Sequence, residues 1–205
     1  MISKQALGNT LFGMADILRD KVEDYKSYIL TLLFFKRLSD NYIWETQNKV
    51  EEFEKQYGKP PNAKQVQKII EKAHDFILPE GCRWIDVRLA SENKKNDTLH
   101  KAVTEIANTN PDLKGIINTV KWNEPSPDGS GGKKLSPIVL TQLINYLDPV
   151  DLSNKNATVD ILGDAYEYLI KRFADENKGG TTAGQFYTPQ EVVDIIVRYW
   201  KKRSK

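Results

Sequence analysis

The sequence predicts an all-α fold, a multi-helix bundle followed by the first helices of a second, truncated domain. Apolar residues recur at steps of three and four through most of the 205 residues, which is the spacing of one face of an α-helix. Helix-start signals precede several of these runs, and no stretch shows the alternation of apolar and polar residues that is typical of a strand. We expect a helical domain over residues 1–150 and the start of another domain over residues 151–205.

The first two predicted helices carry the most apolar residues. One face of the first helix is formed by Leu7, Leu11, Met14 and Leu18. The second helix runs from about Asp24 to Phe53, and its middle is apolar on more than one side, which predicts packing against several elements. Its tail from Lys49 onward is polar and is expected to project into solvent, and Gly58-Lys59-Pro60-Pro61 ends it.

Shorter helices are predicted in the next hundred residues. Asn62 starts one, residues 97–108 form another, and Asn110-Pro111 starts a third that continues to Val120. Ser136-Pro137 repeats this start signal before a helix that reaches Leu147. The predicted irregular stretches are residues 79–86, the loop 123–132 and the break at 148–156.

The remaining chain predicts two more helices. Residues 158–177 have apolar side chains spaced by three or four, and Gly179-Gly180 ends this helix. Thr188-Pro189-Gln190-Glu191 has the form of a capping box and opens the last helix.

Composition excludes several classes of protein. The net charge is +2, and the longest apolar run is far too short to cross a membrane. The first residues lack the apolar region of a signal peptide, and one cysteine excludes an internal disulfide, so a reduced, cytoplasmic setting is expected. Two histidines and Cys82 leave little material for a metal centre or a nucleophilic triad, and we expect no metal.

Most isolated candidates for chemistry favour a structural role. Gly129–Gly132 follows no strand and lacks the Gly-Lys-Ser/Thr ending of a phosphate loop, so a surface loop is expected. His74 and His100 have no second ligand at helical spacing and are expected on helix surfaces or edges. The tryptophans can stack on bases, but burial is the more common fate of this side chain.

One segment, Gly184-Gln185-Phe186-Tyr187-Thr188-Pro189, is a candidate ligand-binding site. Two aromatic residues stand immediately before a capped helix start, where unpaired amides and the helix dipole favour a carboxylate or phosphate. The structural alternative is that Thr188 only caps the helix and Phe186 only packs against its first turn.

This segment, with the Glu191-Val192-Val193 that follows, resembles the motif that opens the catalytic domain of type I restriction-modification methyltransferase subunits. Residues 160–170 resemble the helix before that motif, and residues 7–9 and 32–40 are similar to the helical N-terminal domain of the same subunit. The resemblance therefore spans both ends of the chain. The second domain is, by this resemblance, the start of an α/β methyltransferase domain that depends on S-adenosylmethionine.

In this family the subunit transfers a methyl group from S-adenosylmethionine to adenine N6 in double-stranded DNA. The resemblance implies a cofactor pocket lined in part by Gln185, Phe186, Tyr187, Thr188 and Pro189. It also implies three protein partners, which are a specificity subunit, a second modification subunit and a restriction subunit. The helical domain would serve subunit assembly and closure around DNA, because base flipping requires protein on both sides of the duplex.

By the same resemblance, four basic residues are candidates for contact with DNA phosphates, and the alternative for each is a solvated surface position. They are Lys36, Arg37, Lys133 and Lys134.

Two family motifs are missing. The cofactor loop Asp-Pro-x-x-Gly-x-Gly should follow Pro189, and the catalytic Asn-Pro-Pro-Tyr/Phe is not matched by Asn110-Pro111-Asp112. We therefore expect the N-terminal fragment of a modification subunit, with no catalytic residue in this chain and no methyl transfer by the fragment alone. The alternative is a free-standing helical adaptor or DNA-binding module without a cofactor.

Overall fold

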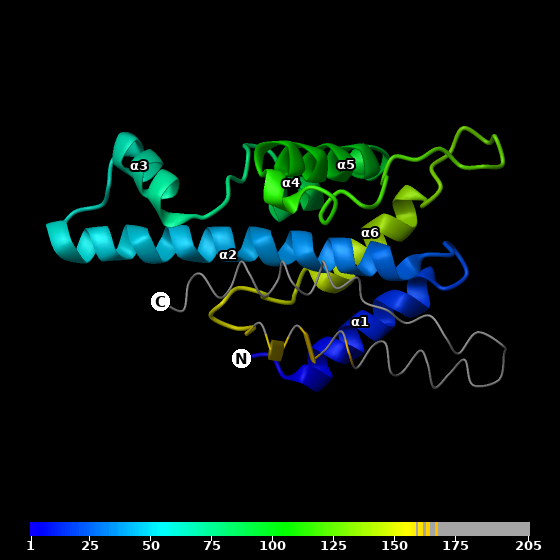
Figure 1. The fold of residues 1–205 in the computed structure, drawn as a ribbon, viewed down its shortest axis with the longest axis horizontal. Coiled ribbons are helices and arrows are strands. Elements are labelled where there is room, and N and C mark those ends of the chain that lie inside the picture. Colours follow the sequence, from blue (N-terminus) through cyan, green and yellow to red (C-terminus); the bar gives the residue numbers. More distant parts are fainter. Residues whose placement is uncertain (159, 162, 165–166, 168–205) are drawn as a thin grey trace. The chain divides into compact units, whose positions relative to one another are not determined.

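The computed structural model describes residues 1–158, 160–161, 163–164 and 167, and it divides the chain into two compact units. One unit comprises residues 14–155 and the other comprises residues 1–13 with 156–205. The described residues contain helices and no strand, apart from one isolated bridge between Pro125 and Lys133, so the predicted all-α fold is confirmed. The helices in chain order (Figure 1) are α1 Lys4–Leu18, α2 Tyr25–Tyr57, α3 Ala63–Ala73, α4 Trp84–Leu89, α5 Glu92–Thr109, the 3-10 turn η1 Pro111–Leu113 and α6 Pro137–Leu147.

The longest of these helices, α2, organises the larger unit. The Asp24 side chain caps its start by accepting from the Ser27 amide, and Gly58 ends it in the left-handed conformation at φ +67°. The Gly58 amide donates to the Glu54 carbonyl at 2.8 Å, as expected for a helix C-cap. The predicted stop at Gly58 is therefore confirmed, and so is the exposed, polar tail of the helix.

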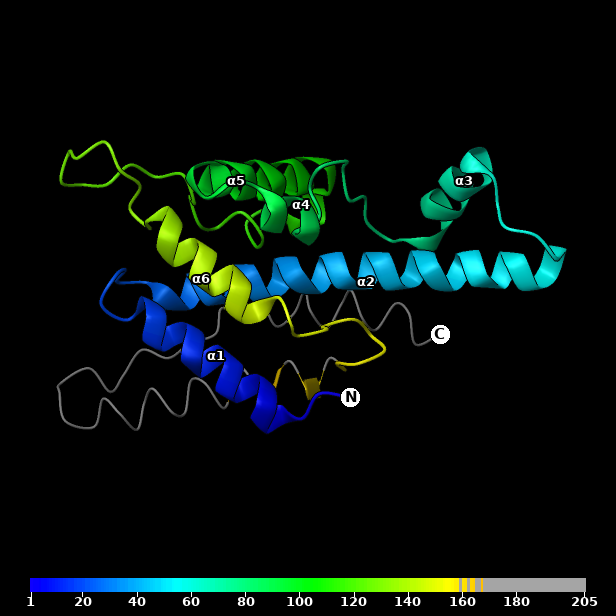
Figure 2. The ribbon, with the colours of Figure 1, turned by 180° about the vertical axis from the view of Figure 1, so that it is seen from behind.

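The core of the larger unit lies between α2 and the later helices. Helix α4 contacts α2, α5 and α6, and α5 packs along α6 (Figures 1 and 2). Trp122 is 1% exposed and meets the Tyr28 ring edge-on, with 5.1 Å between ring centroids. The fully buried apolar side chains of these helices include Ile29, Leu32, Phe35, Leu99, Val103, Ile106, Leu140 and Leu143.

The helix starts behave as their sequences predict. Asn62 and Gln65 form a complete capping box at the start of α3, with bonds of 3.0 and 2.9 Å between side chain and backbone. Ser136 caps α6 by accepting from the Val139 amide, and Pro137 occupies the first turn.

Three predictions of helix position are wrong. The helix expected over 110–120 is only the turn η1, because Gly115 takes a left-handed φ of +83° and its amide bonds the Asn118 side chain instead of a helical carbonyl. The stretch 79–86, expected to be irregular, contains the start of α4, since Asp86 binds back to the amide and guanidinium of Arg83. Helix α5 begins at Glu92 and not near residue 97.

The smaller unit is described only in part. The Ile2 amide donates to the Asn156 carbonyl at 2.9 Å, and Lys4 pairs with Asp164 at 3.3 Å. Of the helix predicted over 158–177, the described residues 160–161, 163–164 and 167 are helical, residue 158 is described and not helical, and the others lie outside the described residues. The predicted apolar face of α1, a helix that contributes to both units, is confirmed by complete burial of Leu7, Leu11, Met14 and Leu18.

Within the described ranges, no helix combines the length and apolar character that crossing a membrane requires.

Candidate functional site

The segment predicted to line a cofactor pocket is not covered by the structure. Gln185, Phe186, Tyr187, Thr188 and Pro189 all lie outside the described residues, as does the helix predicted to start at Thr188. Their assignment to a cofactor therefore stays a prediction.

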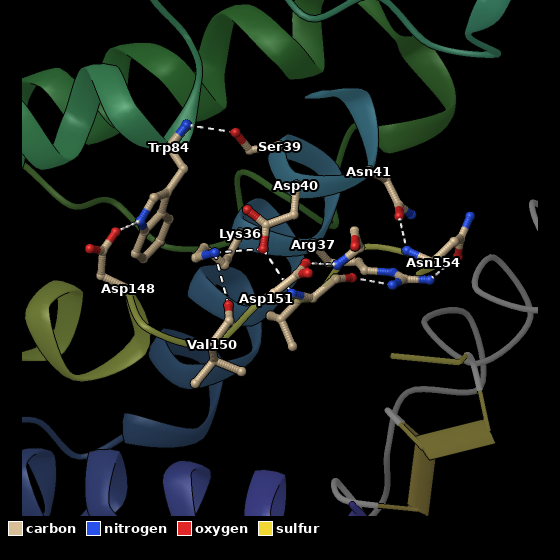
Figure 3. Close-up of polar contacts among 12 residues, drawn as sticks. Lys36, Arg37, Ser39, Asp40, Asn41, Trp84, Asp148, Val150, Asp151 and Asn154 are labelled. Carbon is tan, nitrogen blue, oxygen red and sulfur yellow. Dashed lines mark hydrogen bonds and ion pairs between the residues drawn. The ribbon is translucent and has the colours of Figure 1, made fainter. Parts of the chain in front are cut away.

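The described residues bring together a different group, a set of buried polar side chains in the middle of α2 (Figure 3). We call it the α2 polar cluster, and its members are Lys36, Arg37, Ser39, Asp40 and Asn41. This stretch directly follows the apolar run 28–35, around which the sequence predicts packing on several sides. Polar groups in such a place must find partners in the protein, because no water is available to them.

Lys36 and Asp40 form the first part of the cluster. They lie one helical turn apart, and the Lys36 ammonium donates to the Asp40 carboxylate at 2.5 Å. The same ammonium donates to the Val150 carbonyl at 2.9 Å, and the carboxylate accepts from the Leu152 amide at 2.9 Å. Burial raises the pKa of Asp40 above its ordinary value, and the Lys36 charge opposes this rise. The pair therefore binds a carbonyl and an amide of the same backbone segment, at Val150 and Leu152.

Arg37 also binds this backbone segment. Its guanidinium donates to the Leu152 carbonyl and to the Asn154 side chain, and the residue is 2% exposed. Burial lowers the pKa of Arg37 to about 10, while the nearby Asp40 charge opposes the change, so the group stays charged at neutral pH. A planar guanidinium can satisfy several acceptors at fixed angles, which suits it to holding an irregular loop.

The remaining members connect the cluster to α4 and to the loop. The Asn41 side chain accepts from the Asn154 amide at 2.6 Å, and the Ser39 hydroxyl accepts from the Trp84 amide at 2.8 Å. The Trp84 indole donates to Asp148 at 2.8 Å, so the first residue after α6 is held as well. Figure 3 shows these side chains converging on one stretch of chain after α6, residues 148–154, which we call the junction segment.

The cluster corrects the prediction for two basic residues. Lys36 and Arg37 are buried and bonded to the junction segment, so neither phosphate contact nor a solvated surface position applies to them. The sequence carried a signal for this outcome, since Lys36 and Asp40 are opposite charges spaced by four directly after the apolar run 28–35. Lys133 and Lys134 are more accessible, and they pair with Asp97 at 2.7 Å and with Glu124 at 3.2 Å.

The other isolated candidates have structural roles. The loop around Gly129–Gly132 is exposed, as predicted, and Cys82 is buried, which raises its thiol pKa. The burial expected for tryptophan is found at Trp84 and Trp122. Among the described residues, no group of three His, Cys, Asp or Glu side chains is arranged to hold a metal ion.

His74, expected on a helix surface or edge, is the C-cap residue of α3, and its side chain is buried. Its Nδ1 lies 2.9 Å from a Glu45 carboxylate oxygen, and its Nε2 lies 2.8 Å from the Thr46 hydroxyl. The ring also stacks on Tyr42, with centroids 3.9 Å apart, and its side chain is 2% exposed. His74 follows the last residue of α3 and therefore fastens that end of α3 to α2.

Comparison with known proteins places these features in a family. The family model "HsdM N-terminal domain" matches residues 7–147, and the model "N-6 DNA Methylase" matches residues 157–205. The junction segment held by the α2 polar cluster lies between the two matched stretches.

Curated relatives agree with this match. The methylase subunit of the type I restriction enzyme MjaVIII from Methanocaldococcus jannaschii is 32% identical, over 95% of this chain and 31% of its own length. The corresponding MpnII subunit from Mycoplasma pneumoniae is 25% identical, over 92% of this chain and 38% of its own length. The chain thus spans less than two fifths of the length of these relatives.

A solved structure has the same fold. The methyltransferase subunit of a type I restriction-modification system from Streptococcus thermophilus aligns with a TM-score of 0.65 over 92% of this chain and 42% of that chain, at 24% sequence identity. The predicted resemblance is confirmed, and the chain belongs to the family of type I restriction-modification methylase subunits.

Proposed function

We propose that this chain is the N-terminal part of a modification subunit whose complete form transfers a methyl group from S-adenosylmethionine to adenine N6 in DNA. The observation that carries the proposal is the order of the two family matches, an HsdM N-terminal domain followed by the beginning of an N-6 DNA methylase. In this proposal residues 1–150 form the helical domain and residues 151–205 begin the methyltransferase domain.

The helical domain has a supporting role in this proposal. It packs against a specificity subunit and a second modification subunit, and it closes the complex around double-stranded DNA, with a restriction subunit as a further partner. Support comes from large apolar side chains left exposed on helices that contact each other, such as Leu89 on α4 and Ile138 on α6. A partner that covers such side chains removes their apolar area from water, which favours an interface at this surface.

The α2 polar cluster supports a further part of the proposal, which is that the junction segment belongs to the folded helical domain. Lys36, Arg37 and Asp40 bind three backbone groups of this segment. A segment held through its backbone in this way keeps one path along α2.

The cofactor assignment is a separate proposal. Gln185, Phe186, Tyr187, Thr188 and Pro189 would line part of the S-adenosylmethionine pocket, with the cofactor carboxylate at the start of the following helix. In the complete protein, Phe186→Ala is expected to weaken cofactor binding in calorimetry by about tenfold, the loss of roughly one aromatic contact. Phe53→Ala, at a position in the α2 tail, is the control.

A methylation assay tests the main proposal. The complete protein, mixed with its specificity subunit, should transfer labelled methyl groups from S-adenosylmethionine to adenine in duplex DNA, and residues 1–205 alone should transfer none. Turnover by residues 1–205 alone would show that the expected inactivity is wrong. Absence of transfer by the complete mixture would favour the alternative, a helical adaptor or DNA-binding module without a cofactor.

A further inference from the structure

Helix α3 presents a row of lysines to solvent. Lys64, Lys68 and Lys72 recur every four residues, and all three are exposed. Side chains at this spacing lie on the same face of a helix, about 6 Å apart along its axis. The opposite face, with Val66, Ile69 and Ile70, is half-buried against α2. We call the three basic side chains the α3 lysine row.

The helix that carries this row adds nothing to the buried core. None of its eleven residues is buried, and Figures 1 and 2 show it beside the C-terminal part of α2, apart from α4 and α5. A helix of this length is marginal in isolation. Its first turn is nevertheless closed by the local Asn62–Gln65 capping box, and its C-terminal end is held to α2 by His74 between Glu45 and Thr46. The His74 contacts attach α3 to α2 without contributing a core.

The row carries little compensating negative charge. Within the described ranges none of its three ammonium groups has a carboxylate within 4 Å. Other exposed lysines do have such a partner, for example Lys49 with Glu52 and Lys134 with Glu124. The one acidic residue of α3, Glu71, lies at the edge of the lysine face and accepts from Gln67 at 3.4 Å. On the neighbouring tail of α2 the exposed glutamates, such as Glu51 and Glu54, alternate with the exposed lysines Lys49 and Lys55, so this tail is close to neutral. Of these two neighbouring surfaces, the α3 face therefore attracts a polyanion more strongly.

We propose that the α3 lysine row contacts the phosphate backbone of duplex DNA. This inference rests on the proposed function, in which the domain lies against DNA. The row is linear and about 12 Å long, which suits the regular line of phosphates along a duplex strand. It has no aromatic side chain for stacking on an unpaired base and no apolar side chain for insertion into a membrane. The contact is independent of base sequence, because phosphates carry no sequence information.

The test compares residues 1–205 with a triple variant, Lys64→Gln, Lys68→Gln and Lys72→Gln. Binding to a labelled duplex is measured by fluorescence anisotropy across a series of salt concentrations. Losing three phosphate contacts should lower the slope of log affinity against log salt by about 2.7. The fall in affinity between about 50 and 200 mM salt should therefore be about 40-fold smaller in the variant.

A matched control removes the same charge elsewhere. Lys94→Gln, Lys101→Gln and Lys114→Gln replace three lysines that are exposed on α5 and on the turn after η1. This control should keep the parent salt slope. Circular dichroism should give the same helix content for all three proteins, because the exchanged side chains are on the surface.

Three results would overturn the inference. The first is that residues 1–205 do not bind the duplex, and the second is that the slope changes equally in the two triple variants. The third is that residues 1–205 bind anionic lipid vesicles as tightly as they bind the duplex. If any of these results is found and the complete protein still methylates DNA, the proposed function stands and the α3 lysine row has no part in it.

Discussion

The Lys36–Asp40 pair offers a direct test of how the α2 polar cluster stabilises the fold. Lys36→Met keeps most of the side-chain volume and removes both the 2.5 Å bond to Asp40 and the 2.9 Å bond to Val150. Removing one partner of a buried ion pair leaves the other charge uncompensated, which costs about 3–5 kcal/mol. This loss is a large share of the ~5–15 kcal/mol that stabilises a typical domain. Urea denaturation followed by circular dichroism measures it.

The loss should depend on pH in a defined direction. Because burial raises the pKa of Asp40, the folded protein holds this proton more tightly than the unfolded chain does. Asp40 therefore stabilises the fold below its unfolded pKa, and this contribution is lost as pH rises through the folded pKa. Without Lys36 the folded pKa rises further, so the penalty of Lys36→Met should be complete at pH 7 and small near pH 4.

Two further variants complete the experiment. Adding Asp40→Asn to Lys36→Met removes the stranded charge but keeps an acceptor for the Leu152 amide, and it should recover about 2 kcal/mol. Lys49→Met breaks an exposed pair with Glu52 of 2.8 Å and should cost less than about 0.5 kcal/mol. A loss below about 1 kcal/mol for Lys36→Met, equal at both pH values, would refute the reasoning.

Three other predictions follow from single positions. The Cys82 thiol, buried and with a raised pKa, should react with a disulfide reagent at pH 8 much more slowly in the folded protein than in urea; equal rates would contradict its burial. Gly58→Ala should cost about 1 kcal/mol because φ is +67°, and Gly58→Asn should cost less, as measured by thermal unfolding; the reverse order would argue against a left-handed cap. Asn96→Ala removes a side chain that donates to two buried carbonyls at 3.0 and 2.9 Å and should cost about 2–4 kcal/mol, whereas the exposed Asn108→Ala should be nearly neutral in the same denaturation assay.

Local signals predicted much of the fold. The end of α2 at Gly58, the cap of α3 at Asn62 and the start of α6 at Ser136-Pro137 each depend on contacts within a few residues. Where prediction failed, a second local signal competed. Asn110-Pro111 is a valid helix start, but Gly115 four residues later takes a conformation that stops the helix.

The candidate site was harder to predict because its contacts are distant in sequence. Lys36 and Arg37 are separated by more than a hundred residues from the carbonyl groups that bury them. Periodicity indicates which face of a helix is apolar, but it does not indicate which loop crosses that face. The burial of His74 was missed for the same reason, since its partners Glu45 and Thr46 lie on another helix.

The length of α2 has a mechanical consequence. Its 33 residues form one uninterrupted rod of about 50 Å. The junction segment is fastened near the middle of this rod, and His74 fastens α3 at Glu45 and Thr46, one to two turns further along. The seventeen residues from Asn41 to Tyr57 make a lever arm of about 24 Å, so a rotation of only about 5° around the junction displaces the tip by roughly 2 Å. A small rotation of α2 about the point where the junction segment is attached is thus amplified at the tip of the helix.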